Sequence, residues 1–381
     1  MKTRFSKIAQ RLLIVLTIVG ILSVSMQLEL PAPSGPYPVG RMIFRWVDAS
    51  RPEVLTDDPT DLREVMAMVW YPAVQGTGTD SGYVPDLSVI SDAMAESGEI
   101  EAWQVLGLRL IRSESRLNAK PVSDAGSFPV VILSPGNGTN VELYASLAAE
   151  IASHGYIVIG LNHPYDVAAV KLSDGRIAPY NKDQWLLDMN AHQQYTMERI
   201  KVRTLDVLFA FDQLKLMNAD RMSPFAGILD LDLIAVAGHS LGGITASESC
   251  IADARFKSCL NWDGLRAGSP FSTDFEATPP SQPFLFLTKE SQLHPVQIAH
   301  FDSTTESYWV VIHAALHDNF TDGPLLEPSL LPFPNRADRI MDLIQEFTLA
   351  FLDKTLKGQT ESLLTRPLDQ KDVTVNIYSS P

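Results

Sequence analysis

Cysteine is scarce in this chain of 381 residues, which contains only Cys250 and Cys259. Two cysteines are too few for a small disulfide-based scaffold or for a cysteine-rich metal site, so both classes are excluded. If the protein is exported, the two thiols could pair and close a short loop; otherwise they would stay as two buried free thiols. Both alternatives remain open from the sequence.

Positive charge is also scarce, because 30 lysine and arginine residues stand against 45 acidic residues. Four of the basic residues lie at the extreme N-terminus: Lys2, Arg4, Lys7 and Arg11. Without them 26 basic residues face 45 acidic ones, a net charge of −19. Such a surface repels phosphate backbones and anionic membrane surfaces, and we therefore expect no nucleic-acid partner.

An apolar run at residues 12–26 follows these basic residues, and the first 25 positions contain no acid. A basic stretch followed by an apolar one is typical of an export signal. The run is shorter than the roughly 20 residues of a membrane-spanning helix, and Ser23 and Ser25 offer small residues for cleavage. We predict that residues 1–27 are a signal peptide or an N-terminal membrane anchor, so that the protein is periplasmic, secreted or membrane-associated.

Residues 28–40 are rich in proline and glycine, which favours an extended linker. Residues 41–360 are expected to form one domain, because a chain with 45% hydrophobic and 20% charged residues can bury a full core. Residues 85–118 have loosely helical apolar spacing. We predict a helical insertion there, which either packs on the core or forms an apolar cap for a lipid-like substrate. Residues 361–381 are expected to be a C-terminal tail.

Two alternating runs at 42–46 and 65–71 predict early strands with one buried face. Short apolar runs then alternate with helical patterns, which is typical of a parallel sheet covered by helices on both faces. The predicted strands are 130–133, 156–161, 233–236, 257–262, 284–287 and 309–312, and the predicted helices are 140–153, 190–217, 242–253 and 336–356.

Two of these helices carry additional local patterns. Thr139 and Glu142 are spaced as a capping box at the start of the first helix. The long helix carries an apolar stripe that we expect to be buried: Ile200, Leu205, Leu208, Phe211 and Leu214.

The strongest local pattern is Gly238-His239-Ser240-Leu241-Gly242, which lies between a predicted strand and a predicted helix. A sharp turn between a strand and a helix exposes the central serine, and the flanking glycines allow close backbone approach. This context predicts an α/β-hydrolase fold, with a mostly parallel central sheet, in which Ser240 is the nucleophile. The alternative is a tight turn with a spare hydroxyl.

A serine hydroxyl needs a histidine base and a carboxylate that orients it, and in this fold they follow the serine in the order acid, then histidine. Asp263 ends the next predicted strand and is the expected acid, with Asp302 as the alternative. His317 lies in the loop after the last predicted strand and is the expected base. The other downstream histidines are His294, His300 and His313, and we expect His313 to be structural.

Acyl transfer also needs donors for the oxyanion of the tetrahedral intermediate. The backbone N–H of Leu241, directly after the nucleophile, is one candidate. The second is the N–H of Asn137, in the glycine-rich loop after the strand at 130–133. No second cluster with metal-ligand spacing accompanies His154 and His163, so we expect both to be structural and predict neither a metal nor another cofactor. His239 is expected to pack beneath the nucleophile.

Several sequence blocks, in this order, resemble the plasma platelet-activating factor acetylhydrolase group of α/β hydrolases. They include Gly35-Pro36-Tyr37-Pro38-Val39-Gly40, Phe128-Pro129-Val130-Val131, Ala152-Ser153-His154-Gly155-Tyr156-Ile157-Val158, the Ser240 block through Gly243, Arg255-Phe256, Asp263, and His317-Asp318-Asn319-Phe320. The resemblance implies the same nucleophile, acid, base and oxyanion donors, no metal, and hydrolysis of short or oxidised acyl chains of phospholipids. In some members the inserted helical segment contributes at a lipid surface. This chain has Pro135 where relatives usually have histidine, and a more acidic insertion.

We therefore predict a hydrolase that cleaves short-chain acyl esters through an acyl-Ser240 intermediate, with a small ester or lipid as its substrate. One alternative is a general carboxylesterase or polyester hydrolase. The other is a binding protein that keeps the fold without the activity.

Overall fold

The computed structural model describes residues 28–264, 281–289, 306–326, 336–360, 362–365, 368–369 and 371–379. The predicted export segment therefore lies outside the described residues. None of the helices in the described ranges is long and apolar enough to cross a membrane.

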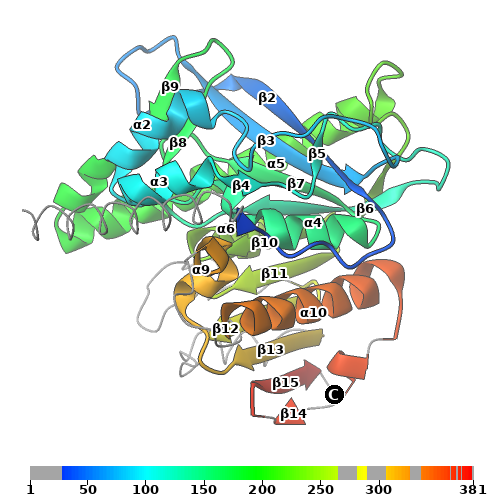
Figure 1. The fold of residues 1–381 in the computed structure, drawn as a ribbon. Helices are drawn as coiled ribbons and strands as arrows, with labels where there is room; N and C mark the ends of the chain where they lie inside the picture. Colours follow the sequence, from blue (N-terminus) through cyan, green and yellow to red (C-terminus); the bar gives the residue numbers. More distant parts are fainter. Residues whose placement is uncertain are drawn as a thin grey trace, which may run out of the picture.

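An eleven-stranded sheet forms the centre of the molecule, in the order β14-β15-β13-β12-β11-β10-β6-β7-β3-β2-β5 (Figure 1). Its parallel part consists of β6 (Phe128–Ser134), β7 (Ile157–Asn162), β10 (Leu229–His239), β11 (Ser258–Trp262), β12 (Phe284–Lys289) and β13 (Glu306–Ile312). All seven residues of β6 are buried, as expected for a central parallel strand with helices on both faces. The mostly parallel α/β-hydrolase sheet predicted from the sequence is confirmed.

Antiparallel strands extend both edges of this parallel core. On one side β3 (Leu62–Pro72) pairs with β7, and β2 (Val39–Pro52) pairs with β3, while the short β5 (Arg116–Leu117) adds to β2 in parallel. On the other side β15 (Val373–Ser379) pairs with β13, and β14 (Leu368–Asp369) pairs with β15. The segment expected to be a tail therefore supplies strands to the sheet. Its strand pattern lacks the strand-helix alternation on which the prediction was based.

Helices cover the two faces of the sheet, and the alternation of side chains along each strand decides which helix each residue meets. Val131 and Leu133 of β6 belong to the core that also contains residues of α4 (Ala145–Ser153) and α10 (Arg336–Lys357). Val130 and Ile132 belong to the core that contains residues of α5 (Met189–Ala219) and α6 (Leu241–Ala252). In Figure 1, α4 and α10 lie in front of the sheet.

The stripe predicted along α5 is wrong at one position, because Leu205 is 46% exposed. Val207 and Ala210 are buried on the packed face instead. This face also buries charged side chains, namely Arg199, Arg203 and Asp206. Buried charges must be paired, and these three pair with partners from other segments, so the face is wider and more polar than its apolar residues predict.

The predicted capping box at the start of the 140–153 helix does not form. This segment begins as a 3-10 turn, Val141–Tyr144, with Asn140 at the N-cap position and no capping bond from the Asn140 side chain. The Glu142 carboxylate is buried and accepts a hydrogen bond from Asn162 Nδ2 at 2.9 Å. The Glu142 side chain, which the capping box would have required, is therefore engaged in a tertiary contact instead.

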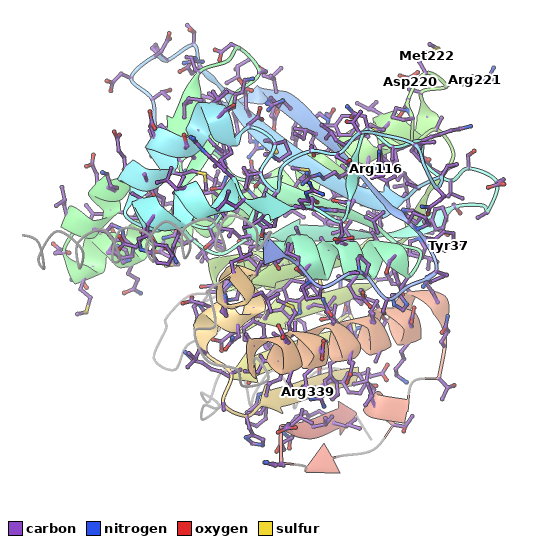
Figure 2. All side chains as sticks on the ribbon, viewed as in Figure 1. Tyr37, Arg116, Asp220, Arg221, Met222 and Arg339 are labelled. Carbon is purple, nitrogen blue, oxygen red and sulfur yellow. A yellow bond between two sulfur atoms is a disulfide. The ribbon has the colours of Figure 1, made fainter. Side chains whose placement is uncertain are left out.

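The segment predicted to be a linker is fastened to the body of the protein. The Ser34 N–H donates to the Glu150 carboxylate at 2.7 Å, and the Tyr37 N–H donates to the Ser153 carbonyl at 3.0 Å. The Tyr37 ring, labelled in Figure 2, packs edge-on against Phe128 with 5.7 Å between ring centroids. The extended backbone predicted from its prolines thus lies along α4 and β6.

The insertion contains two helices, α2 (Leu87–Ser97) and α3 (Ala102–Leu108), and the short strand β4 (Ile111–Arg112), which pairs with β1 (Leu28–Glu29). One side of it packs on the core, where Ile90, Met94 and Val105 are buried. Trp103 and Leu106 are 59% and 60% exposed. The insertion therefore packs on the core and also presents apolar side chains to solvent.

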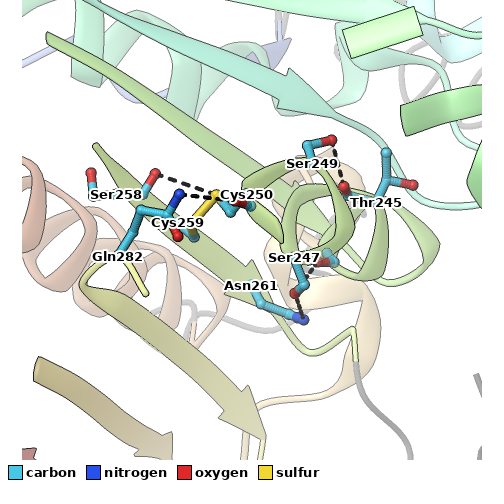
Figure 3. The surroundings of a disulfide bond; sticks show 9 residues. Thr245, Ser247, Ser249, Cys250, Ser258, Cys259, Asn261 and Gln282 are labelled. Carbon is cyan, nitrogen blue, oxygen red and sulfur yellow. Dashed lines mark hydrogen bonds between the residues drawn. A yellow bond between two sulfur atoms is a disulfide. The ribbon is translucent and has the colours of Figure 1, made fainter. Parts of the chain in front are cut away.

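Cys250 and Cys259 form a disulfide, which decides between the two alternatives left open by the sequence. Cys250 is near the end of α6 and Cys259 is in β11, so the bond joins the helix that follows Ser240 to the strand that leads to Asp263 (Figure 3). The Gln282 amide donates to the Cys250 carbonyl at 2.9 Å and ties the next strand to the same corner.

Replacing both cysteines by alanine is expected to lower the free energy of unfolding by about 2.5 kcal/mol, because a cross-link between nearby residues restricts the unfolded chain. Urea unfolding of the double variant and of the oxidised wild type measures this difference. Dithiothreitol should destabilise the wild type and leave the double variant unchanged. Equal stability of the two oxidised proteins would contradict the prediction.

Candidate active site

Ser240 occupies the sharp turn between β10 and α6, in a backbone conformation with φ 54° and ψ −120°. A positive φ is strained for a serine and is maintained only where the surroundings fix it. Here the Ser240 N–H donates to the Trp262 carbonyl at 2.9 Å. A Cβ atom on Gly242 would lie 2.0 Å from the Ser134 carbonyl oxygen, and one on Gly238 would lie 2.1 Å from the Gly242 carbonyl oxygen. Both glycines of the sequence pattern are therefore required by close backbone contact.

Asp263 follows β11, at the same sheet edge as Ser240. Its backbone also has a positive φ of 49°, and its N–H donates to the Leu287 carbonyl at 2.8 Å. The Asp263 carboxylate is almost completely buried, and its Oδ2 atom lies 2.6 Å from Nδ1 of His317. A proton on Nδ1 held by this carboxylate leaves Nε2 of His317 with a lone pair that can accept a proton.

His317 begins a 3-10 turn, His317–Phe320, after β13. The turn is fixed because the Leu316 N–H donates to Asn319 Oδ1 at 2.7 Å. The His239 ring lies 4.5 Å from the His317 ring, between centroids, and stacks on Phe320 at 5.6 Å. His239 is buried and lines the same cavity as Ser240, and its Nδ1 atom lies 2.8 Å from the Tyr144 hydroxyl.

Asp322 anchors the chain that follows His317. Its carboxylate is completely buried, and it accepts hydrogen bonds from the Tyr83 hydroxyl at 2.6 Å and from the Ser146 N–H at 3.2 Å. Its own N–H donates to the Leu143 carbonyl at 2.7 Å. The His317 turn is thereby joined to the beginning of α4.

Burial raises the pKa of Asp322 from 3.8 to about 6. Between these pH values the folded protein holds a proton on Asp322 that the unfolded chain has lost. The contribution of this group to the free energy of unfolding therefore decreases as the pH rises from about 4 to about 6. Asp322→Asn should remove this dependence, so that the variant gains about 3 kcal/mol relative to the wild type over the interval. Urea unfolding at several pH values measures the difference, and parallel curves would contradict the prediction.

The glycine-rich loop after β6 is fixed by hydrogen bonds on both sides of Asn137. The Gly136 N–H donates to the Tyr144 hydroxyl at 2.9 Å, and the Gly138 N–H donates to the Asp166 carbonyl at 2.8 Å. The Asn137 side chain donates to the Tyr180 hydroxyl at 2.8 Å. Within the described part of the chain, the backbone N–H groups of Asn137 and Leu241 have no acceptor. These two amides are thus available to a bound group.

A cavity of about 490 Å³ opens at this edge of the sheet. Ser240, His317 and Asn137 all line it, although they are distant in the sequence. Its apolar wall consists of Met94, Ile100, Leu143, Ala168, Trp185, Leu316 and Pro324. Two acidic residues, Glu99 and Asp318, also line it, and burial raises the pKa of Glu99. The volume suits a small organic ligand.

The structure thus brings together every residue that we expect to act in the reaction. Leu241 is the first residue of α6, directly beside Ser240. His313 is structural as expected, since its Nε2 lies 3.0 Å from the Thr374 hydroxyl. The alternative acid Asp302 and the alternative bases His294 and His300 lie outside the described residues.

The two histidines that flank β7 contact carboxylates. His154 Nε2 lies 3.1 Å from Glu150, and His163 Nδ1 lies 2.8 Å from Asp206. Burial lowers the pKa of His163 to about 4, so this ring is neutral at neutral pH. His163 joins the end of β7 to α5, and His154 Nε2 also lies 3.2 Å from the Ser34 hydroxyl, so both side chains make structural contacts.

Several residues around the cavity were missed by the sequence patterns. Tyr144, Tyr180 and Trp185 come from three different segments, and nothing in their spacing links them to Ser240. One signal was present, because Arg199 and Arg203 are four residues apart in a predicted helix and so share one face with its apolar stripe. Charged residues on a packed face indicate a buried polar site.

Comparison with known proteins places this geometry in context. The sequence profile of the family described as platelet-activating factor acetylhydrolase, isoform II, matches residues 22–372. A probable 1-alkyl-2-acetylglycerophosphocholine esterase of Arthroderma benhamiae is 25% identical over 91% of this chain and 92% of its own length. The platelet-activating factor acetylhydrolase of Cavia porcellus is 25% identical over 86% of this chain and 78% of its own.

A solved structure shares the fold. The ferulic acid esterase from Streptomyces cinnamoneus superposes with a TM-score of 0.71 and 26% identity, over 91% of this chain and 98% of that one.

Proposed function

Since the chain belongs to the platelet-activating factor acetylhydrolase, isoform II, family and is a carboxylic ester hydrolase, we propose that Ser240, Asp263 and His317 are its catalytic residues. The observation that carries the proposal is the 2.6 Å contact between His317 Nδ1 and the Asp263 carboxylate, beside a cavity that Ser240 and His317 both line. Membership of this family favours an enzyme over a binding protein that keeps the fold without the activity.

In the proposed mechanism, His317 Nε2 takes the proton of the Ser240 hydroxyl as its Oγ attacks the ester carbonyl. Asp263 holds the ring in the correct tautomer and stabilises the imidazolium. The backbone N–H groups of Leu241 and Asn137 donate to the oxyanion. His317 then gives the proton to the leaving alcohol, and an acyl-Ser240 ester remains. Water activated by His317 hydrolyses that ester and restores the serine.

The proposed substrate is a phospholipid-like ester with a short acyl chain. Two relatives carry names that specify acetylated glycerophospholipid or platelet-activating factor substrates. The apolar part of the cavity wall, which includes Met94, Ile100 and Trp185, supports binding of an acyl or alkyl group. The exposed Trp103 and Leu106 side chains of the insertion support its contact with a lipid-like substrate.

A general carboxylesterase or polyester hydrolase is the second candidate. The observation that favours it is the likeness to a ferulic acid esterase, whose name specifies an aromatic acid ester. Glu99 and Asp318 in the cavity wall also oppose a phosphate group placed close to them.

We also propose export from the cytoplasm, with residues 1–27 as the signal or membrane anchor. The disulfide between Cys250 and Cys259 supports this proposal, because such bonds persist mainly in oxidising compartments.

A substrate panel tests the proposed function. It compares a 2-acetyl phospholipid, nitrophenyl esters from acetate to dodecanoate, methyl ferulate and a polyester film. Turnover of the phospholipid with a preference for acetate over dodecanoate supports the first candidate. Turnover of the simple or aromatic esters without the phospholipid supports the second. Mass spectrometry after treatment with a fluorophosphonate should find the label on Ser240, and labelling elsewhere would contradict the mechanism.

A further inference from the structure

A buried ion-pair cluster lies directly behind the glycine-rich loop. It consists of Asp166, in the loop after β7, and Arg199 and Arg203, on successive turns of α5. The three side chains are 1%, 4% and 0% exposed. Arg199 binds the Asp166 carboxylate through Nε and Nη2, both at 2.8 Å. Burial by itself raises the pKa of Asp166, but the two arginines hold it below its ordinary value, so this carboxylate is ionised.

The two arginines differ in what else they reach. Arg203 Nη1 donates to the Pro135 carbonyl at 2.8 Å, and its Nη2 donates to the Asp166 carbonyl at 3.2 Å. The same Asp166 carbonyl accepts the Gly138 N–H at 2.8 Å. Arg203 therefore joins both ends of the Pro135–Gly138 turn. Arg199 bonds only the carboxylate of Asp166 among the described residues.

This arrangement determines where the Asn137 N–H points. The Pro135–Gly136 peptide is fixed through the Pro135 carbonyl, and the Asn137–Gly138 peptide is fixed through the Gly138 N–H. The Gly136–Asn137 peptide, which carries the Asn137 N–H, is held between these two. Because the cluster is buried, loss of the guanidinium would leave the Pro135 carbonyl without its charged donor. A backbone donor must lie within a few tenths of an ångström of its place to stabilise the oxyanion fully.

We propose that Arg203 is a positioning residue that holds the Asn137 N–H toward the oxyanion of the tetrahedral intermediate. This inference rests on the proposed function of Ser240 and Asn137. Arg203 does not contact the reacting atoms; it acts through the Pro135 carbonyl and through Asp166.

The test compares Arg203→Met, Arg203→Lys and the matched control Arg199→Met, which removes an arginine from the same cluster and spares the bond to Pro135. Measurements are kcat and KM for nitrophenyl acetate, the affinity for a trifluoromethyl ketone inhibitor that forms an oxyanion on the serine, and the melting temperature. Arg203→Met should lower kcat about 10–100-fold with KM within about threefold, and should weaken inhibitor binding by a similar factor. Arg203→Lys should recover part of the loss.

Arg199→Met should lower the melting temperature while kcat of the folded fraction stays within about threefold. Equal losses of kcat in Arg199→Met and Arg203→Met, or an unchanged kcat in Arg203→Met, would overturn the proposal. If Arg203→Met does not fold, Arg203→Lys decides: a lower kcat with unchanged KM and weaker inhibitor binding supports the role, and a wild-type kcat overturns it. Failure of the proposed function is seen separately, as full activity in Ser240→Ala.

Discussion

Replacement of Ser240 by alanine is expected to lower kcat by at least about 10⁴-fold, because loss of the nucleophile removes the acyl-enzyme pathway. The backbone donors and the binding cavity remain in the variant, so a low rate above that of water is expected to persist. Steady-state kinetics with nitrophenyl acetate measure the loss. The melting temperature should stay close to that of the wild type, since alanine and serine carry the same Cβ atom and so bear the same backbone strain at φ 54°.

Ser249→Ala is the matched control for this prediction. Ser249 lies on α6, the helix that Ser240 precedes, and its hydroxyl donates to the Thr245 carbonyl at 2.7 Å (Figure 3). This variant should keep the wild-type rate. A Ser240→Ala enzyme that retained more than about a hundredth of the wild-type rate would rule out the proposed nucleophile.

Ser134 is another serine that lies beside a histidine and a carboxylate. The Ser134 hydroxyl lies 3.0 Å from His163 Nε2, and His163 Nδ1 lies 2.8 Å from Asp206. All three side chains are completely buried, so a reagent or substrate in solution cannot reach Ser134. Both sets consist of a serine, a histidine and an aspartate, and Ser240 and His317 differ from Ser134 and His163 in lining the cavity.

Asp263→Asn is expected to lower kcat by about 10³–10⁴-fold with a small change in KM. An amide in place of the carboxylate would present a donor or a neutral acceptor to His317 Nδ1, which favours the wrong tautomer and removes the charge that stabilises the imidazolium. Asp302→Asn, at the alternative acid, should retain the wild-type rate. The reverse result, with loss at Asp302 and activity at Asp263, would assign the acid differently.

Lys289 is a second charged residue near the Asp263 carboxylate. Its Nζ atom lies 3.8 Å from Asp263 Oδ2 and its side chain is 39% exposed. A half-exposed lysine at this distance contributes little, so Lys289→Met should change kcat by less than about threefold. We expect the rate to depend on the buried contact between Asp263 and His317 instead.

The succession of strands and helices along most of the chain could be predicted from the sequence, and the structure brings together the residues that the sequence predicts for the site. Apolar runs such as Val130 to Leu133 need only local pattern to predict a buried strand. The glycines around Ser240 leave a local signal because backbone contact at that turn forbids a side chain. Asp263 and His317 could be placed because each follows a strand of a parallel sheet, and the carboxyl ends of parallel strands share one edge.

The tertiary structure decided what depends on neighbours distant in the chain. The pairing of Cys250 with Cys259, the addition of β15 to β13, and the loss of the capping box to the contact between Glu142 and Asn162 belong to this group.

The cavity wall and the cluster around Arg203 also belong there, since a buried charge is stable only with partners that other segments bring. Periodicity reports which side of an element is buried, but it carries no information about which segment will meet that side. The succession of strands and helices, the sharp turn at Ser240 and the residue types proposed for catalysis were therefore determined by the local sequence. The pairing of edge strands, the shape of the cavity and the fixing of its glycine-rich loop were decided only when the chain folded.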